Sequence, residues 1–185
     1  MEVSRIRPLR GPNLWTRHTA VEAMVRCGKD QTDLGLLPGF EARLRHLFPG
    51  IGHLRAGERG AKVSMAHALE AATLHLQTEA GCPVTFSRCT ATTEPDLFQV
   101  VVEYTEEQVG TLALSLAEKL CEAALSDQPF DLESAVKQLH ELDEDIRLGP
   151  STGSIVDAAV ARGIPFRRLT EGSLVQFGWG SKQRR

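Results

Sequence analysis

The chain has 185 residues, of which 42% are hydrophobic and 24% are charged, which is ordinary for a folded globular protein and excludes a disordered chain. The formal net charge is −3, and no aromatic residues are interleaved with a basic run, so nucleic acid is not a favoured partner. No apolar run approaches the roughly 18 residues of a membrane span, and the N-terminus lacks the apolar core of a signal peptide, so we expect no membrane partner.

The cysteines indicate a compartment. Cys27, Cys82, Cys89 and Cys121 are widely separated and form no C-x-x-C pair, which supports neither a zinc ribbon nor a redox motif. Free cysteines in a chain without a signal peptide are typical of a reducing environment. We therefore predict a cytoplasmic protein.

The N-terminal segment predicts a short strand and a tight turn. Apolar residues alternate with arginines over residues 3–9, residues 11–13 (Gly-Pro-Asn) are a turn signature, and Leu14 with Trp15 forms an apolar anchor behind it. The arginines could bind a carboxylate or phosphate, or they could line a solvated strand edge. The run over residues 19–25 fits either a helix or a strand.

The next segments lead to the longest helical pattern of the chain. Residues 28–38 are polar and predict a loop, residues 39–48 predict a helix ended by Pro49, and residues 51–60 predict a second, glycine-rich loop. Over residues 61–81, apolar side chains recur at spacings of three and four, which predicts an amphipathic helix with one buried face.

This long helix carries the only residues that suggest metal chemistry. A zinc peptidase of the H-x-x-E-H type needs two histidines four residues apart, but the sequence has His67, Glu70 and then Ala71 where the second histidine should be. His75 lies about 80° around the helix axis from His67, on the side away from Glu70, so the three do not converge. We therefore expect no metal site and no catalytic residue: His67, Glu70 and His75 are degenerate candidates, and zinc is doubtful.

The middle of the chain predicts a β-hairpin followed by helices. Residues 83–89 alternate in polarity, and residues 97–104 are nearly all apolar, which is typical of a central strand. Glu103, at the end of the second strand, either faces a cleft or is a solvated strand terminus, and we favour the solvated terminus. Helices follow over residues 105–125, with Thr105 as N-cap, and over residues 132–146, with Asp131 as N-cap.

A boundary is predicted at residues 149–152, after which a helix over residues 154–162 and strands over residues 164–169 and 173–177 can bury little apolar area by themselves. The glycine-rich end, residues 178–185, lacks the spacing of a phosphate-binding loop. The fold class is α+β (mixed α/β), with several helices packed on a small sheet that includes the hairpin of residues 83–104.

Short matches in the same order along essentially the whole chain show that the sequence resembles the N-terminal part of the cyanophycin synthetase family. The matching segments are LRGPNLW (9–15), LQ with AG (76–81), VVEY (101–104), LGPST (148–152), RGIP (162–165), SLVQ (173–176) and QRR (183–185).

The resemblance implies a piece of a longer ATP-dependent ligase that polymerises aspartate and arginine into cyanophycin. It divides the chain into an N-terminal polymer-binding domain, residues 1–148, and the truncated start of an ATP-grasp ligase domain, residues 149–185. ATP and magnesium belong to the full-length enzyme, with no cofactor in this fragment. The implied partners are cyanophycin, the remaining ligase domains of the same enzyme, and further copies in a full-length homo-oligomer.

Some N-terminal domains of that family carry an H-x-x-E-H…E site that cuts the polymer into primers. Here His67 and Glu70 match that pattern, whereas Ala71 and His75 depart from it. The resemblance therefore implies polymer binding without catalysis; the alternatives are a metal-dependent peptidase that makes primers, and a structural domain that supports assembly. A polymer with carboxylates and guanidinium groups needs partners of both signs, and Glu58 and Glu70 could contribute acidic ones. The predicted polymer-binding residues are Arg7, Arg10, Asn13, Trp15, Arg17 and Glu103.

Overall fold

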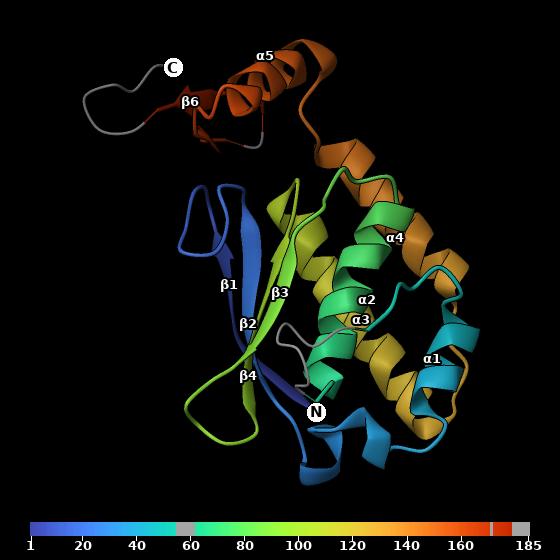
Figure 1. Cartoon of the computed structure of the whole chain (residues 1–185). Coiled ribbons are helices and arrows are strands. Elements are labelled where there is room, and N and C mark those ends of the chain that lie inside the picture. Colours follow the sequence, from blue (N-terminus) through green and yellow to red (C-terminus); the bar gives the residue numbers. More distant parts are fainter. Residues whose placement is uncertain (55–61, 171, 179–185) are drawn as a thin grey trace.

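A four-stranded antiparallel sheet covered on one face by helices forms the body of the protein, and a helix with a two-stranded hairpin forms a tail beyond it (Figure 1). The structure is a computed structural model that describes residues 1–54, 62–170 and 172–178. The strands are β1 (Glu2–Leu9), β2 (Ala20–Arg26), β3 (Ser87–Ala91), β4 (Leu97–Glu103), β5 (Phe166–Arg168) and β6 (Val175–Phe177), and the α-helices are α1 (Phe40–Leu47), α2 (Met65–Glu79), α3 (Glu107–Ser126), α4 (Leu132–Ile146) and α5 (Pro150–Ala161).

The strand order in the main sheet is β1-β2-β4-β3, with every neighbouring pair antiparallel. The predicted hairpin is therefore confirmed, and so is the central position of its apolar strand β4. The undecided run over residues 19–25 is strand β2. The mixed α+β fold class is confirmed as well.

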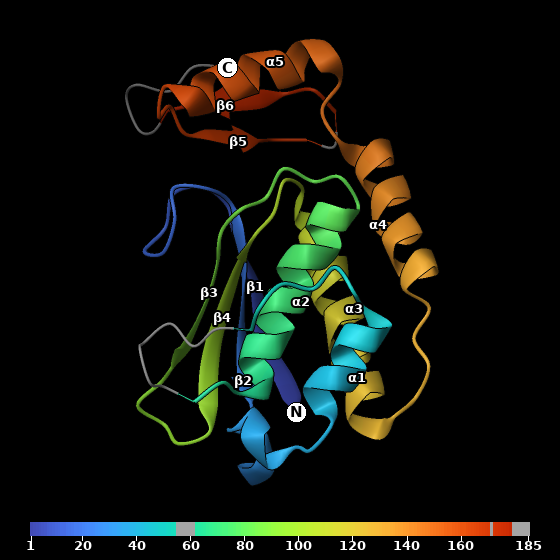
Figure 2. The ribbon, with the colours of Figure 1, turned by 45° about the vertical axis from the view of Figure 1, so that its right-hand side comes forward.

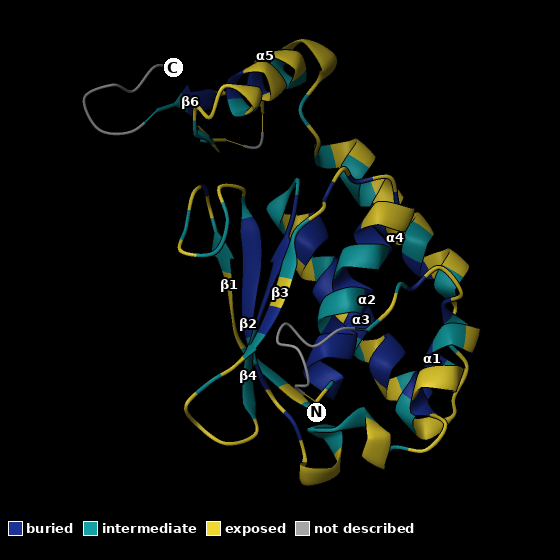
Figure 3. Ribbon diagram, in the orientation of Figure 1, coloured by how far each residue is buried: buried dark blue, intermediate teal, exposed yellow. Residues whose placement is uncertain are grey.

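Alternation along the strands decides which side chains face the helices. Val21, Ala23 and Val25 of β2 face the helices together with Val100 and Val102 of β4, and all five belong to the hydrophobic core. Helices α2 and α3 lie on this face, whereas in both views no described helix lies on the opposite face (Figure 2). Burial follows the same layering, with the dark core between the sheet and the helices (Figure 3). The largest fully buried side chains include Phe40, Leu44, Phe48, Leu69, Leu76, Leu114, Leu120 and Leu139.

Several predicted boundaries move. Helix α3 has Glu106 rather than Thr105 as its N-cap, so the predicted cap is wrong by one residue, whereas Asp131 caps α4 by accepting a hydrogen bond from the Ser134 N–H. Helix α5 begins at Pro150, because proline suits the first helical position, where its missing N–H leaves no intrahelical bond unmade.

One predicted loop contains helical turns, and a second lies mostly outside the described residues. Residues 28–38 contain two short 3-10 helices, Lys29–Gln31 and Leu34–Leu36. Most of the predicted loop over residues 51–60, with Glu58, lies outside the described residues, as does most of the glycine-rich end. No helix of the described chain is long and apolar enough to cross a bilayer.

Candidate functional site

The outer face of the sheet, the one turned away from the helices, carries charged and polar side chains in register. One row of paired residues crosses all four strands. Arg7 of β1 pairs with Glu22 of β2, Glu22 pairs with Val101 of β4, and Val101 pairs with Arg88 of β3. Paired residues of antiparallel strands point to the same side of the sheet. The row therefore places one arginine on each side of a carboxylate on one surface of the sheet, which we call the outer face.

Glu22 is the buried centre of this row. Its residue is only 3% exposed, and its carboxylate accepts hydrogen bonds from the Arg7 Nε–H and from the Gln99 side-chain amide. The hydrogen bond from Arg7, together with its positive charge, holds the pKa of Glu22 below its usual value. A negative charge is thus fixed beneath the more exposed arginine side chains.

The loop between β1 and β2 folds an aromatic ring onto the same surface. The Asn13 Oδ1 accepts hydrogen bonds from the backbone N–H groups of Trp15 and Thr16, at 2.9 and 3.0 Å, and so fixes the turn. The guanidinium carbon of Arg88 lies 5.3 Å from the centroid of a Trp15 ring, within the range of a cation–π contact. The predicted apolar anchor is wrong for Leu14, which is 95% exposed.

The other two predicted arginines, Arg10 and Arg17, belong to this loop. Arg10 makes a two-pronged contact with the Glu107 carboxylate at the start of α3, at 2.6 and 2.9 Å. Arg17 is exposed, and no hydrogen bond or ion pair joins it to the described residues. Arg17 is therefore available to a ligand without the loss of an internal contact.

Glu103 is not the solvated strand terminus that we favoured from the sequence. Its Oε2 accepts hydrogen bonds from the backbone N–H groups of Thr85 and Phe86, both at 2.9 Å, and the residue is only 7% exposed. Its Oε1 lies 3.6 Å from the His18 Nδ1. The carboxylate thus holds the chain that leads into β3, while its second oxygen faces the loop between β1 and β2.

His67 has a structural role at the start of α2. The backbone N–H of Ser64, the N-cap residue, donates to the His67 Nδ1 at 3.1 Å, and the Ser64 hydroxyl lies 2.9 Å from the same nitrogen. This is the arrangement of a capping box with histidine in the N3 position. Burial lowers the pKa of His67, which favours the neutral ring whose Nδ1 accepts this bond.

Glu70 and His75 have different hydrogen-bond partners from His67. Burial raises the pKa of Glu70, partly offset by a hydrogen bond with Ser87. The His75 Nε2 accepts a hydrogen bond from the Gly52 N–H at 3.2 Å, and burial lowers its pKa. Within residues 1–54, 62–170 and 172–178, no three histidine, cysteine or acidic side chains form a group suited to a metal ion.

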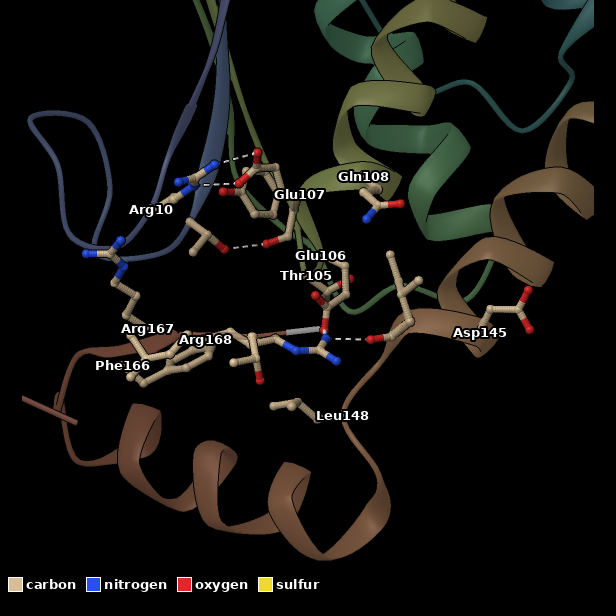
Figure 4. A pocket seen from close by; sticks show the side chains of 15 residues that line it. Arg10, Thr105, Glu106, Glu107, Gln108, Asp145, Leu148, Phe166, Arg167 and Arg168 are labelled. Atoms are coloured by element: carbon tan, nitrogen blue, oxygen red, sulfur yellow. Dashed lines mark hydrogen bonds and ion pairs between the residues drawn. The ribbon is translucent and has the colours of Figure 1, made fainter. Parts of the chain in front are cut away.

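A pocket of about 840 Å³ lies between the body and the tail (Figure 4). Arg168 of β5 closes one wall by donating to the Glu106 carboxylate at 2.9 Å and to the carbonyl oxygen of Ile146. Sequence reasoning missed this pocket, because the Arg167-Arg168 and Glu106-Glu107 pairs show opposite charges but no local pattern that brings them together. The remaining lining residues are Arg10, Thr19, Tyr104, Thr105, Gln108, Asp145, Leu148, Phe166, Leu169 and Thr170.

The chain is similar to one characterised family over its whole length. The family described as "Cyanophycin synthase-like N-terminal domain" matches residues 24–126. Cyanophycin synthetases of Geminocystis herdmanii and Trichormus variabilis are 32% and 33% identical to the chain over 205 and 204 aligned residues. The alignments cover 100% of this chain but only 23% and 22% of those two proteins, so the chain spans about a quarter of the length of the relatives it matches.

Proposed function

Since the chain belongs to the family of cyanophycin synthase-like N-terminal domains, we propose that it binds cyanophycin, a polymer carrying both carboxylates and guanidinium groups, and that it catalyses no reaction itself. One observation carries the proposal: the sheet face on which no described helix lies holds the exposed Arg7 and Arg88 in one row with the buried Glu22, and the Trp15 ring lies against Arg88.

The chemistry of this outer face suits a ligand of mixed charge. The exposed arginines of the face, Arg7 and Arg88, and the exposed Arg17 of the adjoining β1–β2 loop can pair with carboxylates through two parallel N–H groups. The ring of Trp15 already lies against the guanidinium of Arg88, so a ligand guanidinium would find the same kind of surface there. The capping contact of His67 supports the absence of catalysis, because the nitrogen that bonds Ser64 is engaged in helix structure.

The proposal extends to the whole protein from which such a domain comes. Residues 1–148 would form the polymer-binding domain, and residues 149–185 would begin an ATP-grasp ligase domain. The remaining ligase domains would be its partners in a cytoplasmic homo-oligomer, with ATP and magnesium bound outside this chain.

Binding of the purified 185-residue chain to short soluble aspartate–arginine segments tests the proposal. The affinity, measured by fluorescence anisotropy, should fall as salt rises from about 50 mM to about 500 mM, because exposed charge pairs are screened. Arg17→Ala should weaken binding about two- to fivefold, the effect of losing one exposed ion pair.

The matched control is Arg45→Ala, which removes one partly exposed arginine from α1 on the helical side, where Glu41 is its one ion-pair partner among the described residues. This variant should bind like the parent chain. Absence of binding at low salt, or binding that does not change with salt, would refute the proposal. Chelator-sensitive shortening of the segments would replace it with the peptidase alternative.

A further inference from the structure

The pocket between the body and the tail collects charged side chains from both parts of the molecule. The body contributes Arg10 at the end of β1 and the acidic pair Glu106-Glu107 at the start of α3, while the tail contributes Arg167 and Arg168 of β5. Its volume of about 840 Å³ lies within the range typical of ligand pockets, about 300–1,000 Å³. The half-buried ring of Phe166 and the buried Tyr104 add apolar lining.

Most of these charges already have partners, and this defines which groups are left for a ligand. Arg168 forms an ion pair with Glu106 and a hydrogen bond with the end of α4. The side chains of Arg168 and Glu106 are each less than one fifth exposed. Arg10 is joined to Glu107 by two hydrogen bonds. We treat these two pairs as walls of the pocket. A ligand could bind either arginine only by breaking its existing contact with a glutamate.

Two charged residues of the lining remain exposed and without a hydrogen bond or ion pair to the described residues, Arg167 and Asp145. Figure 4 shows Arg167 extending from β5 towards the loop between β1 and β2, on the side where Arg10 lies. Asp145 lies at the opposite end, on the last turn of α4. A positive and a negative group thus stand at the two ends of one pocket.

We propose that this pocket binds a peptide-like segment that carries both a carboxylate and a guanidinium group, with Arg167 pairing the carboxylate and Asp145 pairing the guanidinium. The inference rests on the proposed function and extends it from the outer face to the tail. The loop between β1 and β2 joins the two surfaces, because Trp15 lies against Arg88 while Arg10 and Thr19 at the loop ends line the pocket. Bound segments therefore contact both the body and the tail.

The test uses the full chain and short soluble aspartate–arginine segments, with charge-matched variants on the tail. Arg167→Ala should weaken binding about two- to fivefold, the loss expected for one exposed ion pair. Its control is Arg162→Ala, which removes an exposed arginine of the tail that does not line the pocket. Among the described residues, the Arg162 side chain bonds the Ala158 carbonyl oxygen alone. The control should bind like the parent.

The negative end is tested in the same way. Asp145→Asn should weaken binding about two- to fivefold, whereas Asp157→Asn, on the exposed side of α5 and outside the pocket lining, should not. Added segments should also slow amide hydrogen exchange in residues 166–170 of the parent chain but not of Arg167→Ala.

The outcomes separate this inference from the proposed function. If the parent binds, Arg17→Ala weakens binding and Arg167→Ala behaves like Arg162→Ala, the polymer binds through the β1–β2 loop without the pocket, and the inference is refuted while the proposed function stands. If the parent does not bind at all, the proposed function fails and the inference fails with it. Weakening by both pocket variants, with both controls unchanged, supports the inference.

Discussion

Glu22 and Glu103 are carboxylates on neighbouring strands of the same sheet face, but their surroundings differ. Glu22 is held by the side chains of Arg7 and Gln99, whereas Glu103 is held by two backbone N–H groups that precede β3. A residue type at a strand position therefore does not decide its role, because the neighbours that satisfy each oxygen come from other strands.

Glu22 should make stability depend on pH in the acidic range. Because its folded-state pKa is lowered, mainly by the Arg7 hydrogen bond, its contribution is present above the unfolded-state pKa of about 4.3 and is lost as pH falls through the folded-state pKa. Glu22→Gln should therefore be less stable than the parent at pH 7, and the gap in urea midpoint should narrow below about pH 4.

The control for this prediction is Glu41→Gln, which removes one negative charge from a surface ion pair on α1. Its urea midpoint should stay close to that of the parent at pH 7, since exposed pairs contribute little. A gap between Glu22→Gln and the parent that is the same at pH 7 and in acid would contradict the assigned ion pair.

His67 should behave as a helix cap when it is replaced. His67→Ala should lower the free energy of unfolding by about 0.5–2 kcal/mol, because the Ser64 N–H loses its acceptor and the edge contact with the Phe98 ring is removed. His67→Gln should cost clearly less, since glutamine can accept the same bond from the N3 position. Urea unfolding measures both, and equal losses would exclude the capping role.

At the scale of elements, the join between β4 and α3 depends on a glycine. A Cβ built on Gly110 would lie 2.6 Å from the Cβ of Tyr104 and 3.0 Å from its ring. Tyr104 directly follows β4, and Gly110 is buried in the first turn of α3. The close approach lets the helix fold back onto the sheet immediately after the strand.

The two helical glycines should therefore respond in opposite directions to alanine. Gly110→Ala should destabilise the protein by about 1–3 kcal/mol, because the added methyl group collides with Tyr104. Gly153→Ala in α5 should be neutral or stabilising by up to about 1 kcal/mol, since its Cβ would meet only the Leu148 carbonyl oxygen at 3.7 Å. Thermal or urea unfolding of the two variants makes the comparison, and a similar response at both sites would refute it.

At the scale of the whole molecule, Arg168 ties the tail to the body. Its guanidinium contacts both the N-cap residue of α3, Glu106, and the Ile146 carbonyl oxygen in the last turn of α4. Burial raises the pKa of Glu106, whereas the charge of Arg168 lowers it. The ion pair with Glu106 and the hydrogen bond to Ile146 thus let one arginine of β5 hold α3 and α4.

Removing this contact should loosen the tail without unfolding the body. Arg168→Ala should speed amide hydrogen exchange in residues 150–178 and protease cleavage at residues 147–149, while exchange in the core strands stays slow. A double-mutant cycle with Glu106→Gln should give a coupling of about 0.5–3 kcal/mol. Arg162→Ala is the control. If amide exchange in the tail were equally fast in Arg168→Ala and in this control, Arg168 would not be what holds the tail to the body.

The sequence by itself determined most of the helices and strands, because periodicity and turn residues are local signals, but it left strand β2 undecided and gave no sign of the two 3-10 helices. The long helix, the hairpin and the helix capped by Asp131 were predicted in this way, and so was the loss of convergence among His67, Glu70 and His75. The family resemblance was also readable, since it rests on short motifs in order.

Only the tertiary structure decided which side chains meet. The row of Arg7, Glu22 and Arg88 depends on the register of four strands, and the contact of Arg168 with Glu106 joins residues 62 positions apart. The burial of Glu103 was missed for the same reason, because its partners precede a different strand. Local patterns carry no information about such long-range pairings, which are set by how whole elements pack.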